Sequence, residues 1–120
     1  MLPSRNRLTD GADFRLVVRR GRRSGGSLMV VHLLVPNVDK ATESPPQVGF
    51  VVAKAVGPAV TRNRVKRRLR HLMRERVTSL PSGSMLVVRA LPAAAGATFG
   101  DLAAELDRCL QREAARVTSR

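Results

Sequence analysis

A basic stretch between Gly57 and Pro81 constrains the fold more than any other part of the sequence. It begins with Gly-Pro, a turn signal whose proline also suits the first turn of a helix, and nothing breaks a helix from Thr61 to Pro81. At about 100° per residue, five apolar side chains fall on one side. They are Val65, Leu69, Leu72, Met73 and Val77. The spacing predicts an amphipathic helix whose apolar side is buried.

The opposite side of this helix is cationic, and Glu75 is the only acid in the segment. It carries Asn63, Arg67, Arg70 and Arg74, with Lys66 at its edge. Each pair of like charges four residues apart destabilises an isolated helix by roughly 0.2–0.5 kcal/mol. The phosphates of a polyanion would remove that repulsion, and their binding would release counterions. A solvated face is the alternative, although solvated faces usually mix both signs of charge. The pattern favours a nucleic-acid-binding face.

The whole chain has the same cationic balance. Its 120 residues form one domain by length, and 22 basic against 9 acidic residues give a net charge of +13, which predicts a polyanionic partner. We expect a membrane surface to be the weakest candidate, because no apolar run approaches 18 residues and the N-terminal residues lack the apolar central region of a signal peptide. The single cysteine, Cys109, fits a reducing, cytoplasmic compartment. Two histidines and one cysteine far apart have no zinc-ligand spacing, so we expect no metal site built from protein ligands alone.

The remaining elements follow from local patterns. Residues 1–8 are expected to form a flexible basic arm, and Thr9 or Asp10 can cap a first helix that stops near Gly21. An arginine-rich, flexible connection follows. Strands are predicted over residues 27–35, 48–53 and 85–89, and a last helix begins at Thr98, where Asp101 completes a capping box. The order α-β-β-α-β-α predicts a single α+β domain over residues 1–120, with a small sheet that carries its helices on one face.

The second predicted strand has two different faces. Val48, Phe50 and Val52 point one way and are bulky enough to pack under helices. Gly49, Val51 and Ala53 point the other way and are small, so another backbone could come close to them, and Lys54 follows at the end of the strand.

The segment from Val48 to Lys54, followed by Val56-Gly-Pro-Ala-Val-Thr-Arg-Asn-Arg-Val-Lys-Arg, resembles the signature of the bacterial ribonuclease P protein subunit. Arg62-Asn63-Arg64 matches the Arg-Asn-Arg motif of that family, which is followed by a basic helix. Asp13-Phe14 and Gly21 match the family's first helix. The resemblance covers roughly residues 5 to 115.

This resemblance implies an uncommon left-handed crossover between the second and third strands, whereas right-handed is the default. It also implies a protein that binds the catalytic RNA of ribonuclease P and the 5′ leader of precursor tRNA, while the RNA holds Mg²⁺ and performs the hydrolysis. The implied ribozyme-binding residues are Arg62, Asn63, Arg64, Lys66, Arg67, Arg70 and Arg74. The implied leader cleft contains Phe14, Gly49, Val51, Ala53 and Lys54.

The sequence departs from the family pattern at three places. Val18 replaces a second aromatic residue of the first helix, the first strand has Val31 beside His32 where an aromatic is common, and Ala55 follows Lys54 in place of a second lysine. Leader binding is therefore expected to depend on Phe14 and on electrostatics. A phenylalanine buried in the core is the alternative reading of Phe14.

Three other functions compete with this interpretation. A structural RNA-binding protein of the ribosomal type would share the fold class and the charge. A DNA-binding regulator would need a helix-turn-helix or a dimerisation element, and neither is recognisable. A self-sufficient nuclease would need clustered carboxylates or histidines to hold metal ions, and the sequence has no such cluster.

Overall fold

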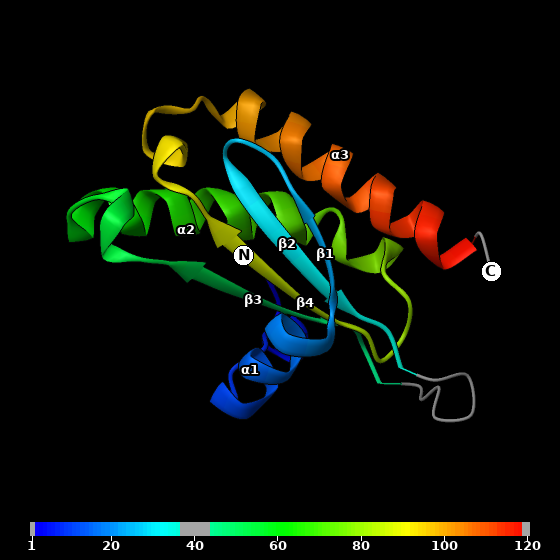
Figure 1. Ribbon diagram of the computed structural model, residues 1–120. Helices are drawn as coiled ribbons and strands as arrows, with labels where there is room; N and C mark the ends of the chain where they lie inside the picture. The colour runs from blue at the N-terminus through cyan, green and yellow to red at the C-terminus, as the bar shows by residue number, and fades with distance from the viewer. Residues whose placement is uncertain (1, 37–43, 119–120) are drawn as a thin grey trace.

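The computed structural model describes residues 2–36 and 44–118 (Figure 1). Its helices and strands form a single α+β domain, as predicted. In chain order they are α1 (Gly11–Arg20), β1 (Arg22–Gly25), β2 (Met29–Leu34), β3 (Gln47–Val52), α2 (Ala59–Arg74), β4 (Met85–Ala90) and α3 (Phe99–Thr118). The described residues also include four short 3₁₀ helices, of which the first precedes α1: η1 (Ser4–Asn6), η3 (Lys54–Val56), η4 (Val77–Ser79) and η5 (Pro92–Gly96). No helix in the described part of the chain is long and apolar enough to cross a membrane.

The sheet has the order β1-β2-β4-β3, and the first of these strands was not predicted. β1 occupies the arginine-rich segment expected to be a flexible connection, and it pairs antiparallel with β2 from Arg22 opposite Leu33 to Gly25 opposite Val30. Its sequence, Arg-Arg-Ser-Gly, has no apolar alternation. Charged residues are nevertheless common on an edge strand, because they discourage pairing with other chains. The residue pattern therefore did not indicate β1, which is stabilised by its pairing with β2.

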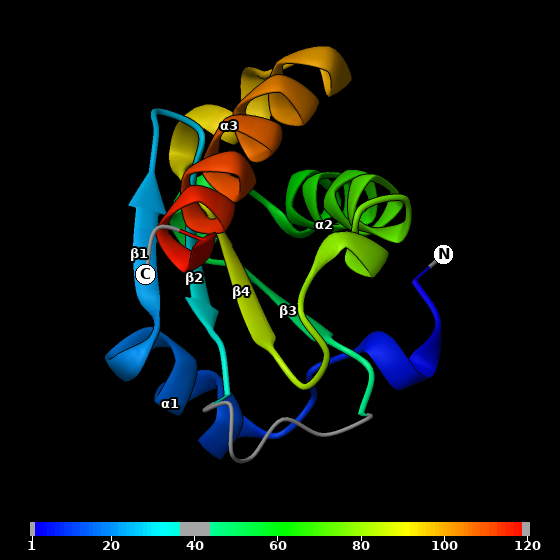
Figure 2. The same ribbon diagram turned by 90° about the vertical axis from the view of Figure 1, so that its right-hand side faces the viewer.

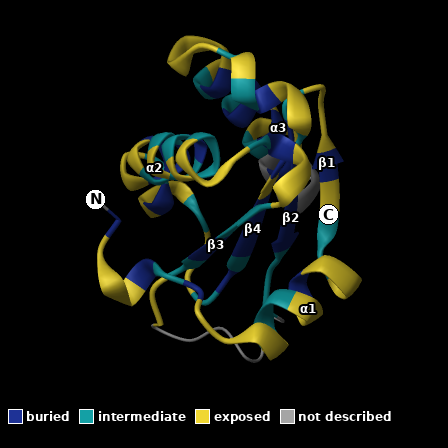
Figure 3. Ribbon diagram, turned by 90° about the vertical axis from the view of Figure 1, so that its left-hand side faces the viewer, coloured by how far each residue is buried: buried dark blue, intermediate teal, exposed yellow. Residues whose placement is uncertain are grey.

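The helices cover both faces of the sheet, which corrects the expectation of helices on one face. α2 and α3 lie on one side and α1 lies on the other (Figure 2). The larger core lies under α2 and α3 and includes Leu69, Met73 and Leu106, which are fully buried. A smaller core under α1 contains Leu8, Val17 and Val87, with Phe14 and Val51 packed at its margin. Figure 3 shows β2 and β4, which are mostly buried, between these layers.

The connection from β3 through α2 to β4 is left-handed, as the family resemblance implied. The two strands are parallel and adjacent. In Figure 2 they run away from the viewer with α2 above the sheet, and the chain passes from β3 on the right to β4 on its left. A right-handed connection would move to the right in this view. This connection places the basic helix over β3, next to the sheet edge that also contacts the N-terminal segment.

The N-terminal segment is docked, in contrast to the flexible arm expected over residues 1–8. Leu2, Asn6 and Leu8 are buried. The backbone N–H of Leu8 donates to the Val48 carbonyl at 2.9 Å, and Asn6 Nδ2 donates to the Pro46 carbonyl at 2.8 Å. The segment therefore extends the edge of β3. Only Met1 of this range lies outside the described residues.

The predicted helix ends are confirmed by their hydrogen bonds. The Asp10 side chain accepts from the Ala12 N–H at 2.8 Å, and the Gly21 N–H donates to the Val17 carbonyl at 2.7 Å. At the start of α3, the Asp101 N–H donates to Thr98 Oγ1 at 3.0 Å and the Thr98 N–H donates to Asp101 Oδ2 at 3.4 Å. These two bonds form the expected capping box.

A buried carboxylate joins α3 to the turn between β1 and β2. Glu105 is 3% exposed, and its oxygens accept from the backbone N–H groups of Ser27 at 3.2 Å, Leu28 at 2.6 Å and Met29 at 2.8 Å. A side chain at Gly26 would collide with this carboxylate. The turn is therefore built around a charged acceptor contributed by a helix almost eighty residues later in the chain.

Replacing Glu105 with alanine should leave three backbone donors of the turn without their acceptor. Hydrogen bonds to charged groups contribute about 1.5–3 kcal/mol, so we expect the free energy of unfolding to fall by at least that amount. Gln111→Ala, an exposed position on the same helix, should change it by less than about 0.5 kcal/mol. Chemical denaturation of both variants checks this, and equal stabilities would contradict the anchoring role of Glu105.

Candidate nucleic-acid interface

α2 presents charge away from the sheet because its apolar side is fully packed. Val65, Leu69 and Met73 have no exposed surface, as the helical spacing predicted. On the opposite side Asn63, Arg67 and Arg74 are exposed. The predicted apolar side of the helix is therefore confirmed, and three of the residues predicted for its cationic side are exposed. Burial of the apolar side determines the direction in which the front points.

The seven residues expected to form one ribozyme-binding face do not share one surface. Lys66 and Arg70 lie on the flank of α2 that faces the N-terminal segment, where they line a depression. Arg64 lies on the other flank, and its Nη2 donates to the Ala95 carbonyl at 3.0 Å. Arg62 folds back at the start of the helix, with Nε donating to the Gly57 carbonyl at 3.1 Å. Arg62 and Arg64 thus make contacts within the protein, while Asn63, Arg67 and Arg74 form the open front.

Phe14 is the residue at which α1, β3 and the α2 flank meet. Its ring lies directly over Gly49, and a Cβ on that glycine would collide with the tip of the ring. The side chain is half-buried and borders the smaller core. The ring is therefore neither fully buried nor fully exposed, because one part packs on the sheet and another part remains accessible.

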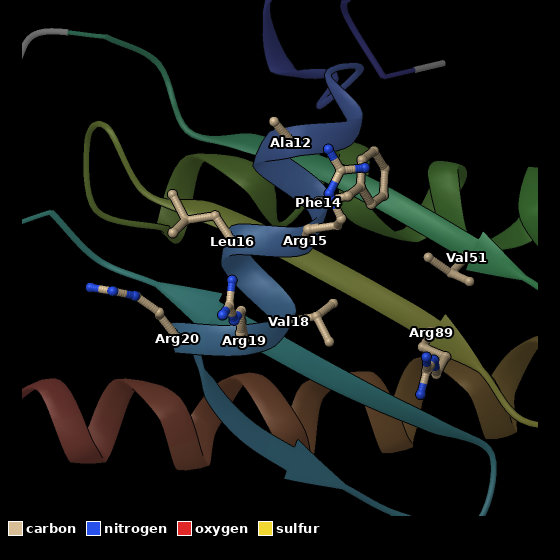
Figure 4. A pocket seen from close by; sticks show the side chains of 9 residues that line it. All are labelled: Ala12, Phe14, Arg15, Leu16, Val18, Arg19, Arg20, Val51 and Arg89. Carbon is tan, nitrogen blue, oxygen red and sulfur yellow. The ribbon is translucent and has the colours of Figure 1, made fainter.

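Two depressions adjoin the Phe14 ring. The first, of about 630 Å³, lies between α1 and the sheet (Figure 4). It is lined by Ala12, Phe14, Arg15, Leu16, Val18, Arg19, Arg20, Val51 and Arg89. The second, of about 240 Å³, is lined by Arg7, Leu8, Thr9, Phe14, Val48, Gly49, Phe50, Lys66 and Arg70. The ring thus belongs to both depressions, and cations lie around each of them.

The predicted cleft residues are only partly brought together. Gly49 and Val51 face the α1 side of the sheet with Phe14, as the alternation along β3 indicated. Ala53 and Lys54 follow the end of the strand and are exposed, and neither lines either depression. Of the three small residues expected in the leader cleft, only Gly49 and Val51 therefore lie beside Phe14.

None of the cations around the larger depression was predicted to belong to the leader cleft, although Arg19 and Arg20 were part of the arginine-rich segment noted in the sequence. Figure 4 shows Arg19 and Arg20 on α1 at one side, Arg89 on β4 at the other, and Val18 between them. Arg89 had a usable signal, since it is the only charged residue in a strand that is otherwise apolar. Arg15 and Arg19 are separated by one helical turn and also had a signal in their spacing. Apolar surface flanked by guanidinium groups suits a ligand that combines flat bases with phosphates.

No group of three or more His, Cys, Asp or Glu side chains among the described residues could hold a metal ion. The lone cysteine, Cys109, is buried, and burial raises the pKa of its thiol. His32 is also buried, which lowers the pKa of its imidazole, with further lowering from Arg89 and Arg23.

The geometry can now be compared with known proteins. A family model described as Ribonuclease P matches residues 2–114 of the chain. The chain belongs to the ribonuclease P protein family. A relative from Nocardioides sp., named "Ribonuclease P protein component", is 58% identical over 118 residues, which cover 98% of this chain and 99% of the relative. One from Streptomyces griseus with the same name is 56% identical, covering 93% of this chain and 94% of the relative.

Solved structures of the family share the fold. The Staphylococcus aureus RNase P protein has a TM-score of 0.77 at 23% identity, covering 90% of this chain and 94% of that one. The Thermotoga maritima RNase P protein, solved with 1-(4-fluorophenyl)-2-thiourea, has a TM-score of 0.69 at 25% identity, covering 83% of this chain and 92% of that one. Membership of the family makes this chain the protein component of a ribonucleoprotein endoribonuclease of tRNA processing, with an RNA subunit as its partner.

The contact between Phe14 and Gly49 can be measured with a double-mutant cycle. Gly49→Ala forces the ring away from the sheet, and overpacking of this kind costs typically about 1–3 kcal/mol of stability. In a Phe14→Ala background the added methyl group finds space, so Gly49→Ala should cost much less there. Denaturant unfolding of the four proteins gives the coupling energy. An equal cost of Gly49→Ala in both backgrounds would mean that the ring does not occupy this position.

Proposed function

We propose that this chain binds the catalytic RNA of ribonuclease P through the α2 front and the 5′ leader of precursor tRNA beside Phe14, and so assists endonucleolytic removal of the leader. The observation that carries the proposal is the position of Phe14. A partly accessible ring lies over Gly49, borders two arginine-lined depressions and adjoins the basic helix of the family signature.

The α2 front supports the first part of this proposal through its charge. Asn63, Arg67 and Arg74 are exposed on a helix that contains no acidic residue. Guanidinium groups match phosphate geometry, and each neutralised phosphate releases counterions. Asn63 adds a hydrogen-bonding group that suits a phosphate or a 2′-hydroxyl without adding charge. Structured RNA, which has closely spaced phosphates, fits this face.

The depressions beside Phe14 support the second part. An unpaired leader exposes its bases, and a base stacked on an aromatic side chain contributes about 1–3 kcal/mol. Val18 and Val51 add apolar surface next to the ring, while Arg19 and Arg89 provide cations at the two sides. Such a surface favours a single strand, because a duplex hides its bases from side-chain stacking.

The hydrolysis itself is assigned to the RNA partner. We propose that Mg²⁺ is held there, with no catalytic residue in this chain, and that the complex acts in the cytoplasm. Within this division, the protein's cations bind RNA phosphates and hold the leader beside the catalytic RNA. Neither DNA nor a membrane is expected as a partner.

Lys66 and Arg70 connect the two binding surfaces. They were expected to belong to the ribozyme face, yet they line the smaller depression together with Phe14 and Gly49. The path of the leader and the contact with the catalytic RNA therefore meet along this flank of α2. Substitutions at these two positions should weaken binding of both RNAs. A substitution at Arg67 should weaken binding of the catalytic RNA alone, and one at Phe14 should weaken binding of the leader alone.

Reconstitution tests the function directly. The purified protein, added to ribonuclease P RNA at low Mg²⁺, should restore cleavage of precursor tRNA. A structural RNA-binding protein of the ribosomal type would bind RNA without restoring cleavage, and that outcome would favour the alternative function.

Three alanine variants should give three different binding profiles. Arg67→Ala should weaken binding of the catalytic RNA and lower the salt slope by about one unit at most, with little effect on the leader. Phe14→Ala should weaken binding of leader-bearing precursor tRNA by up to about 3 kcal/mol and leave leaderless tRNA nearly unchanged. Arg70→Ala should weaken both interactions.

Arg108→Ala removes the same charge from α3 and should change neither interaction specifically. Salt-titrated binding of the catalytic RNA, and binding of both tRNAs by the assembled complex, measure these profiles. Equal losses for leader-bearing and leaderless tRNA in Phe14→Ala would remove Phe14 from the leader site. A collapsed melting temperature in that variant would show that core packing is the main role of the ring.

A further inference from the structure

A third depression, of about 270 Å³, lies between α2 and the first turn of α3, where Arg67, Arg68, His71 and Phe99 line it. We propose that it is a nucleotide-binding subsite that takes one unpaired nucleotide of the catalytic RNA, with the base against Phe99 and the phosphate against the two arginines. The inference rests on the proposed function, because it adds a second contact to the α2 front.

The exposure of Phe99 is the first argument for this subsite. The sequence has three aromatic residues, and Phe99 lies at helical spacing from Leu102 and Leu106, a pattern that is typical of a core residue. Phe99 is instead 41% exposed, whereas Phe50 is packed against the main core. An aromatic ring left in solvent between cations matches the surfaces on which proteins stack unpaired bases.

The backbone that carries the ring is also held in place before any ligand binds. The capping box of Thr98 and Asp101 fixes the first turn of α3, and Arg68 Nη1 donates to the Ala97 carbonyl at 3.2 Å. One helical turn earlier, Arg64 makes the corresponding bond to Ala95 at 3.0 Å. Two arginines of α2 thus fasten the segment that carries Phe99. A backbone that is already fixed loses little further freedom on binding, which favours affinity.

His71 contributes the second ring of the depression. The centroids of His71 and Phe99 are 5.6 Å apart, and the ring planes are inclined by 65°. Because the rings are inclined rather than stacked on each other, ring surface remains for a base. Arg67 is exposed at the adjacent edge, where it can meet the phosphate of the same nucleotide.

The position of the depression identifies which RNA would occupy it. It lies on the Arg64 and Arg68 flank of α2, and Lys66 and Arg70 with the leader site lie on the other flank. Arg67 belongs both to the open front and to this depression. An RNA that lies along the front therefore reaches Phe99 directly, whereas a leader beside Phe14 would have to cross the helix. The catalytic RNA is accordingly the expected occupant.

Substitutions at Phe99 separate stacking from charge and from apolar packing. Phe99→Ala and Phe99→Leu should weaken binding of the catalytic RNA by about 5- to 150-fold with an unchanged salt slope, because a stack is lost and no phosphate contact is removed. Phe99→Trp should bind like the unsubstituted protein. The leucine variant keeps apolar bulk, so it tests the ring even if the alanine variant folds poorly.

Nucleotide-resolved chemical probing of the catalytic RNA locates the occupant. The unsubstituted protein should protect an unpaired nucleotide that becomes reactive again with Phe99→Leu and not with Gln111→Ala, the exposed control on the same helix. Unchanged affinity and probing with Phe99→Leu would overturn the subsite. Protection that moves to the precursor tRNA leader would overturn the choice of occupant. If Arg67→Ala still weakens binding in either case, the proposed function stands independently of this subsite.

Discussion

The burial of the α2 apolar stripe against the sheet is the interaction on which the rest of the structure depends. Leu69, Met73 and Val65 are fully removed from solvent, so the helix has one permitted rotation about its axis. That rotation directs Arg67 and Arg74 outward and places Lys66 and Arg70 beside Phe14. Each pair of like charges on the helix costs about 0.2–0.5 kcal/mol. Burial of each large apolar side chain contributes about 1.5–3 kcal/mol, so burial outweighs the repulsion.

α2 consequently separates the depressions beside Phe14 from the depression beside Phe99. One flank meets the N-terminal segment and β3, and the other meets the η5 loop and α3. Each flank ends at a partly exposed phenylalanine, Phe14 on one side and Phe99 on the other. In our proposal the open front binds phosphates, and the two rings receive unpaired bases from different RNAs.

Local patterns in the sequence predicted the elements that bury their own apolar stripes. The α2 stripe, the two faces of β3 and the capping box at Thr98 were all readable, because each depends on residues a few positions apart. β1 was not readable, since its pairing with β2 depends on the neighbouring strand and not on its own apolar content. The placement of α1 opposite α2, the docking of residues 2–8 and the inward turn of Arg64 depend on distant partners in the same way. The left-handed connection came only from the family resemblance.

Site-directed RNA cleavage tests the central claim that α1 and the α2 front contact different RNAs. The buried Cys109 should resist labelling, so single cysteines at Val60 and Val18 can each carry a hydroxyl-radical-generating iron chelate. Val60 is 79% exposed, seven residues before Arg67 on the same side of α2, and Val18 lines the depression on α1. In the assembled complex, the probe at position 60 should cut the catalytic RNA and the probe at position 18 should cut the leader of precursor tRNA. Cleavage of the same RNA region from both positions, or cleavage of the leader from position 60 alone, would contradict this division.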